Sequence, residues 1–141
     1  MMKEPMDFPQ RLARFKCSVE PLAEAIAISE QRAFTDLEQL GFIHRFELCF
    51  DLACELIEHC CHHQEPQASI QGRRDAFYCV FKHGLINDVQ LWMDMIKSRQ
   101  HTVHSYNKNT ADEIALEVIQ RYYPALMALK QQLEDKAAAY E

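Results

Sequence analysis

The feature that most constrains this chain is the spacing of its apolar side chains, which recur every three or four residues along almost the whole length. A repeat near 3.6 residues places apolar side chains on one face of an α-helix. The sequence contains only three Gly and five Pro, too few for the many turns of an all-β protein. The pattern therefore predicts an all-α fold.

Length and composition indicate one globular domain. The chain has 141 residues, of which 48% are hydrophobic, and a chain of this size can bury a core of its own. Because no repeat or linker divides it, we expect a single domain over residues 1–141. No apolar run approaches the roughly 18 residues of a membrane span, and no secretory signal is visible at the start. We therefore expect a cytoplasmic protein that does not enter a membrane.

Capping patterns predict where the first two helices begin. Pro9 suits the first turn of a helix that should end near residues 29–33. Thr35, with Glu38 three residues later, forms the pattern of a capping box at the start of a long second helix. Gly41 lies inside this helix, so we expect either a bend there or the close approach of another backbone.

Two shorter helices are predicted after the loop of residues 64–72. The first covers residues 73–83, and Gly84 suits the left-handed conformation that often follows a helix. The next is capped by Asn87 or Asp88 and runs to about Val103.

The last predicted helix begins at Thr110, which forms a capping-box pattern with Glu113. Pro124 lies inside it and should kink or restart it, because proline has no amide proton to donate. About five helices joined by mostly short connections predict an antiparallel up-and-down bundle.

The five residues from His59 to His63 read His-Cys-Cys-His-His and could ligate a soft metal ion. Structural zinc sites, however, usually take paired ligands from two separate segments, and the chain offers no second pair. Cys60 also falls on the apolar face of its helix. We therefore favour a structural role for this run over a metal site, and we expect the six cysteines to be reduced thiols.

The charge balance limits nucleic-acid binding to a compact site. The net charge of −6 disfavours extensive coating of a duplex, which needs many basic groups. A small basic site remains open to the chain, with local and more distant basic residues available to it. These are Lys97, Arg99 and Lys108, with Arg45, Arg73 and Arg74 from elsewhere in the sequence.

Arg99, His104 and Tyr106 follow one another at the predicted end of the fourth helix. The guanidinium fork of arginine matches phosphate oxygens, and histidine exchanges protons near neutral pH. Together these groups suffice in principle to cleave RNA without a metal. A base activates the 2′-hydroxyl, an acid protonates the leaving oxygen, and the cation stabilises the phosphorane.

Helical geometry restricts how Arg99 and His104 could meet. Five positions along a regular helix place them about 140° apart around the axis. They converge if the helix ends between them, or if a two-fold dimer brings two copies of the segment together. In the alternative interpretation, Arg99 caps helix carbonyls, His104 is a surface residue and Tyr106 only packs.

Three segments, taken in order, carry a family resemblance. They are GFIHRFEL at residues 41–48, FKHGLIND at 81–88, and WMDMIKSR at 92–99, which runs on to HSYN at 104–107. In this order the chain resembles the HEPN superfamily and, more narrowly, the nucleotidyltransferase substrate-binding proteins. The resemblance extends over about residues 15–135.

This resemblance implies a dimeric helical bundle, with no cofactor, that works with a separate minimal nucleotidyltransferase. Two functions follow from it. The chain is either a metal-independent ribonuclease toxin, with RNA such as tRNA as substrate, or a non-enzymatic subunit that presents substrate to the transferase. A helical dimer with neither role is the third interpretation. In the ribonuclease interpretation, the transferase silences the toxin by attaching AMP to a tyrosine.

The resemblance also assigns roles to individual residues. Arg99 and His104 would be the ribonuclease pair, and Tyr106 would accept AMP. The residues expected to support the cleft are Arg45, Glu47 and Gln100. Gln100 stands where the family often has Asn, so its longer side chain would displace a hydrogen bond made there.

Overall fold

The described part of the chain is entirely helical. The computed structural model describes residues 6–104 and 107–140, with the side chains of residues 102–104 outside that description. Within these ranges there are helices and connecting turns and no strand, so the all-α prediction is confirmed. Helices α1 (Phe8–Gln31) and α2 (Asp36–Gln64) form a long antiparallel pair.

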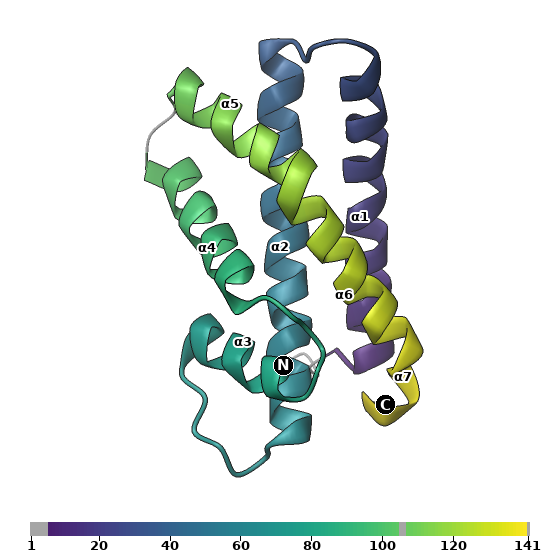
Figure 1. Cartoon of the computed structure of the whole chain (residues 1–141). Coiled ribbons are helices and arrows are strands. Elements are labelled where there is room, and N and C mark those ends of the chain that lie inside the picture. Colours follow the sequence, from purple (N-terminus) through teal and green to yellow (C-terminus); the bar gives the residue numbers. More distant parts are fainter. Residues whose placement is uncertain (1–5, 105–106, 141) are drawn as a thin grey trace, which may run out of the picture.

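The other helices pack against this pair (Figure 1). Helix α3 (Gly72–Lys82) lies against α2, and α4 (Val89–His104) follows it. Then α5 (Lys108–Glu117), the π-helical turn η1 (Val118–Tyr122) and α6 (Tyr123–Asp135) form one continuous rod. Its first part packs against α2 and its last part against α1, and a short helix, α7 (Ala137–Tyr140), follows.

Most of the predicted helix ends are confirmed. At the start of α2, the backbone N of Glu38 donates to Oγ1 of Thr35 at 3.1 Å, and the backbone N of Thr35 donates to the Glu38 carboxylate at 2.9 Å. This is a complete capping box. Asp88 caps α4 by accepting from the backbone N of Leu91 at 3.1 Å. Gly84 has φ of +80° directly after α3, the conformation for which glycine was predicted there.

The predicted cap at Thr110 is wrong. With Thr110 as N-cap the helix would begin at residue 111, whereas α5 begins at Lys108, three residues earlier. Its N-cap is Asn107, whose side chain accepts hydrogen bonds from the backbone N of Asn109 and of Thr110. Asparagine is a somewhat better N-cap than threonine, so the earlier start is favoured. Thr110 and Glu113 keep the capping-box spacing but lie inside the helix.

The predicted interruption at Pro124 takes the form of a π-helical turn. Immediately before the proline, the backbone N of Tyr123 donates to the carbonyl of Val118, five residues back. A π turn inserts an extra residue and shifts the hydrogen-bond register. The helix can therefore pass Pro124, which lacks a donor, without ending.

Aromatic rings from four elements meet in the core. Phe46 of α2 stacks on Phe50, one turn later, and on Tyr122 of η1, with ring centroids 5.9 and 5.4 Å apart. Trp92 of α4 contacts Phe50 and also Phe77 of α3. All five side chains are at most 2% exposed. These contacts fix the positions of α3, α4 and η1 relative to α2.

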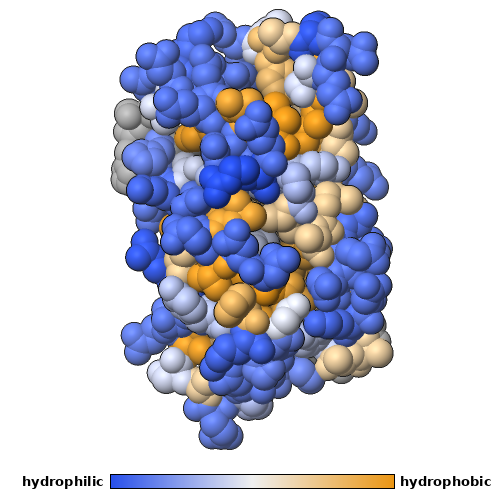
Figure 2. Space-filling view, in the orientation of Figure 1, coloured by the Kyte–Doolittle hydropathy of each residue, from blue (hydrophilic) through white to orange (hydrophobic). Residues whose placement is uncertain are grey.

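Some apolar side chains remain outside the core. Leu37 and Leu40, at the start of α2, are 80% and 44% exposed. Figure 2 shows that hydrophilic side chains cover most of the displayed face, with apolar side chains visible in a band between them. None of the helices in residues 6–104 and 107–140 is both long enough and apolar enough to cross a membrane.

Gly41 provides a test of helix propensity in α2. A Cβ built at this exposed position meets no atom within 4 Å, so no other backbone comes close to it. We expect Gly41→Ala to raise the free energy of unfolding by about 0.5–1 kcal/mol, as measured by urea denaturation. The matched control is Gly84→Ala, which should be destabilised because its φ is +80°. Loss of stability in Gly41→Ala would contradict the open surroundings of this residue.

Candidate functional site

Two carboxylates of α2 hold the predicted catalytic arginine on α4. Nη1 of Arg99 lies 2.8 Å from Oε2 of Glu47, and Nη2 lies 3.3 Å from Oδ2 of Asp51. Glu47 and Asp51 are four residues apart on one helix, so they share a face. The Arg99 side chain is 26% exposed. Glu47 and Asp51 therefore help to hold its guanidinium group in one orientation, while part of it stays open to solvent.

Asp51 also binds a second arginine. Nη1 of Arg73, at the start of α3, lies 3.1 Å from Oδ1 of Asp51. The Arg73 guanidinium also lies over the ring of Phe50, 5.5 Å from its centroid, which favours one placement of the group. The two oxygens of one carboxylate thus bind one guanidinium each. We call Glu47, Asp51, Arg73 and Arg99 the arginine–carboxylate cluster.

The three residues expected to support the cleft have different surroundings in the structure. Glu47 contacts Arg99 directly. Arg45 lies exposed on α2 and forms no hydrogen bond or ion pair with any described residue. Gln100 follows Arg99 and is exposed. Sequence reasoning missed Asp51, although its spacing of four residues from Glu47 was a usable signal.

His104 and Tyr106 lie at or within the gap between the two described parts of the chain. His104 is the last residue of α4, its side chain lies outside the described part of the chain, and Tyr106 lies outside it entirely. Helix α4 does not end between Arg99 and His104, so these two positions stay about 140° apart around its axis. The meeting of the two side chains remains a prediction. Because α4 is continuous here, a helix end between the two residues cannot bring them together, and a second copy of the chain is the other route considered.

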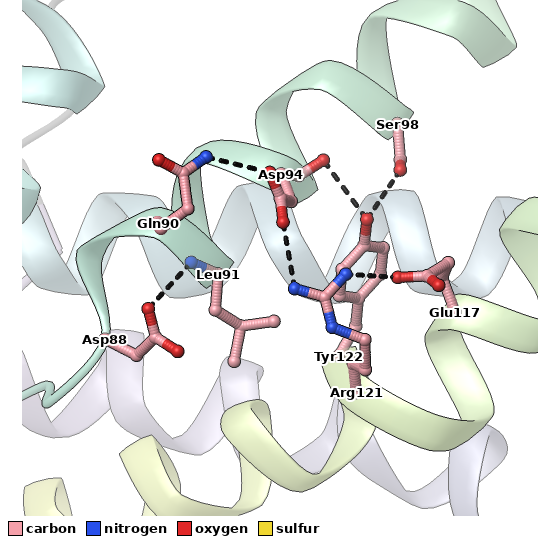
Figure 3. A network of polar contacts seen from close by, with 8 residues as sticks. All are labelled: Asp88, Gln90, Leu91, Asp94, Ser98, Glu117, Arg121 and Tyr122. Atoms are coloured by element: carbon pink, nitrogen blue, oxygen red, sulfur yellow. Dashed lines mark hydrogen bonds and ion pairs between the residues drawn. The ribbon is translucent and has the colours of Figure 1, made fainter.

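A polar network fixes α4 against η1 just before Arg99 (Figure 3). Arg121 bridges the carboxylates of Asp94, at 2.8 Å, and Glu117. The hydroxyl of Tyr122 donates to the backbone carbonyl of Asp94 at 3.2 Å, so the hydroxyl of Ser98, 2.8 Å away, acts as its donor. Arg121 lowers the pKa of Asp94, and burial raises the pKa of Tyr122. Both shifts keep these groups in the protonation states that the network needs near neutral pH.

The contribution of this network can be measured at Tyr122. Replacing Tyr122 by Phe keeps the buried ring and removes the hydroxyl from two hydrogen bonds. We expect the free energy of unfolding to fall by about 0.5–1.5 kcal/mol in urea titrations. Tyr123→Phe is the matched control, because the Tyr123 hydroxyl forms no hydrogen bond within the described residues. Equal effects of the two substitutions would contradict the network.

The side chains of the His59 to His63 run are divided between the core and the surface. Among residues 6–101 and 107–140, no three His, Cys, Asp or Glu side chains are grouped so that they could hold a metal ion. Cys60 and Cys61 are completely buried, as the apolar pattern predicts for Cys60, while His62 and His63 are exposed. Burial raises the pKa of Cys60 to about 12, which keeps the thiol protonated and a poor metal ligand.

Comparison with solved structures supports the helical fold. Two crystal structures of mutants of the toxin-antitoxin MntA-HpeT are similar to this chain, with TM-scores of 0.72 and 0.69. Each is 17% identical in sequence, and each match covers 89% of this chain and 95% or 96% of the other. At this level of identity the likeness concerns the fold. No curated protein matches the chain.

Comparison with protein families gives a match over nearly the whole chain. The model of the family described as "Nucleotidyltransferase substrate binding protein like" matches residues 10–135. This range includes α2, α3 and α4, and with them the arginine–carboxylate cluster. The resemblance seen in the sequence is confirmed, and the chain belongs to the nucleotidyltransferase substrate binding protein like family.

Proposed function

We propose that this protein is a metal-independent ribonuclease that works with a separate minimal nucleotidyltransferase as a toxin–antitoxin pair. Its family is described by nucleotidyltransferase substrate binding, and the two similar crystal structures are of a toxin-antitoxin. The observation that carries the proposal is the placement of Arg99. Glu47 and Asp51 orient its guanidinium group on a partly exposed face of α4. Such a preorganised cation can stabilise a phosphorane.

The reaction that fits these residues is transfer of a phosphodiester to the neighbouring 2′-oxygen. His104 takes the proton of the 2′-hydroxyl, whose oxygen then bonds to phosphorus, and the bond from phosphorus to the 5′-oxygen breaks. A protonated histidine returns a proton to that leaving oxygen. Arg99 stabilises the negative charge on the phosphorane. The products are a 2′,3′-cyclic phosphate and a 5′-hydroxyl.

A homodimer supplies the groups that one chain lacks. The reaction uses one histidine as base and a second as acid, and each chain offers one at position 104. Because α4 runs through both Arg99 and His104, a two-fold axis beside this helix is the simplest arrangement that brings pairs of both residues together.

Silencing would act on Tyr106. The nucleotidyltransferase would join the phosphorus of AMP to the tyrosine hydroxyl oxygen and release pyrophosphate from ATP. The modification would add a negative charge close in sequence to Arg99 and His104. It would then compete with the RNA phosphate for the cation and fill the space that the RNA needs.

The test uses the purified chain and total tRNA in EDTA. We expect cleavage that leaves 2′,3′-cyclic phosphate ends. Preincubation with the nucleotidyltransferase, ATP and Mg²⁺ should add one AMP to Tyr106 and abolish cleavage, while Tyr106→Phe should take up no AMP and keep cutting. If no RNA is cut at any protein concentration, the ribonuclease proposal is wrong.

A non-enzymatic binding subunit is the second candidate function. The net charge of −6, and the two carboxylates beside Arg99, favour it because both repel a polyanionic substrate. In that case the chain would bind the transferase tightly and cut no RNA. Arg99→Ala and His104→Ala would then leave the activity of the complex unchanged, whereas the ribonuclease proposal requires both to lower cleavage by at least about 10²-fold.

A further inference from the structure

A shallow, wide-open groove adjoins the arginine–carboxylate cluster. It lies between the start of α3 and the side of α4, and its lining residues are Gln71, Gly72, Arg73, Arg74 and Ile96. Arg73 belongs both to this groove and to the cluster, where it shares the Asp51 carboxylate with Arg99. Arg73 therefore links the groove to the Asp51 carboxylate that also binds Arg99.

The two arginines of the groove differ in how they are held. Arg73 is fixed between Asp51 and the ring of Phe50, and its side chain is still 37% exposed. Arg74 is exposed and forms no hydrogen bond or ion pair with any described residue. One cation is thus preorganised, and the next along the chain can adjust to a ligand.

Helix stability does not explain why two arginines stand here. Both lie in the first turn of α3, where the partial positive charge of the helix end disfavours cations. Asp75 is the acidic residue of this turn. Its carboxylate accepts a hydrogen bond from the backbone N of Gln71, at the start of the same helix. The arrangement places two cations at the groove of a chain whose net charge is −6.

We propose that this groove is a subsite for single-stranded RNA, in which Arg73 and Arg74 bind backbone phosphate next to the phosphate that is cut at Arg99. The inference rests on the proposed ribonuclease function. Guanidinium groups bind phosphate oxygens through paired donors. Asp51 is then a positioning residue, because its two oxygens hold Arg73 and Arg99 close together on either side of one carboxylate.

RNA fits this groove better than an acidic protein surface does. Arg73 and Arg74 line one groove, and Arg73 shares Asp51 with Arg99, so these cations can face the closely spaced phosphates of one strand. Ile96, which is 9% exposed, adds a small apolar surface that a sugar or base can contact. Docking of the nucleotidyltransferase is the competing use of the groove, and the experiment separates the two.

The binding test uses chains with His104→Ala, which should hold RNA without cutting it. Binding of a fluorescent single-stranded RNA is followed by anisotropy at several salt concentrations. We expect Arg73→Ala and Arg74→Ala each to weaken binding about fivefold. Each should also reduce the slope of log K against log salt by about 0.7, the value for one phosphate contact on a single strand. Arg14→Ala, an exposed arginine on α1, is the matched control and should change neither quantity.

Cleavage assays separate failure of the subsite from failure of the proposed function. In the otherwise unaltered chain, Arg74→Ala should raise KM several-fold and leave kcat nearly unchanged, while His104→Ala should abolish kcat. If both groove variants bind and cut RNA normally and His104→Ala still abolishes cutting, the groove proposal is wrong and the ribonuclease stands. If the unaltered chain neither binds nor cuts RNA, the ribonuclease itself is wrong. If the groove variants lose the transferase and keep RNA, the groove is a protein-docking surface and the proposal is overturned.

Discussion

Arg99→Ala is expected to lower the rate of RNA cleavage about 10²–10³-fold while the chain stays folded. The loss is large because a preorganised cation acts on charge that develops only in the transition state. The cost to folding is small because Asp51 keeps its ion pair with Arg73. Glu47 and Asp51 then repel each other across one helical turn, which costs only about 0.2–0.5 kcal/mol. Single-turnover cleavage of tRNA in EDTA measures the rate, and urea denaturation measures the stability.

Two further variants sharpen this result. Arg99→Lys keeps the charge, but an ammonium group cannot present the planar fork that reaches both Glu47 and Asp51, so most of the rate should still be lost. Arg14→Ala removes an exposed arginine of α1 and should leave cleavage unchanged. Cleavage by Arg99→Ala at the unaltered rate would remove Arg99 from the mechanism.

The fold could be predicted well wherever local chemistry decides the structure. The start of α2 at Thr35, the start of α4 at Asp88 and the glycine conformation at Gly84 depend on a few neighbouring residues. The predicted start of α5 is wrong because the capping-box spacing of Thr110 and Glu113 competes with Asn107, which is the better N-cap residue and lies three positions earlier. The dimer expected from the resemblance involves a second chain and stays a prediction.

In the candidate site, helix geometry again predicts the direction of each side chain but not the contacts between helices. Arg45, Phe46 and Glu47 are consecutive, and each helical step turns the side chain by roughly 100°. Arg45 therefore faces solvent, Phe46 enters the core and Glu47 reaches Arg99. A helical wheel separates these three directions. It does not show that Arg73, from another helix, shares Asp51 with Arg99, because that depends on how α3 and α4 pack on α2.

The second large effect is expected in the core. Phe46→Ala should lower the free energy of unfolding by about 3–5 kcal/mol, because it removes a completely buried ring that stacks on Phe50 and Tyr122. The chain has one tryptophan, Trp92, whose contact with Phe50 makes its fluorescence a probe of unfolding in urea. Phe81→Ala is the matched control, because Phe81 is 46% exposed and should cost far less.

This variant also separates stability from chemistry. Phe46 and Glu47 project in different directions from α2, and the ion pairs of Arg99 do not involve the Phe46 ring. In cool buffer without denaturant, the folded fraction of Phe46→Ala should therefore cut RNA at close to the unaltered rate, whereas Arg99→Ala should cut about 10²–10³-fold more slowly with only a small loss of stability. A loss of stability below about 1 kcal/mol would contradict the packing of Phe46 against η1, because truncation of a well-packed buried ring costs several times more.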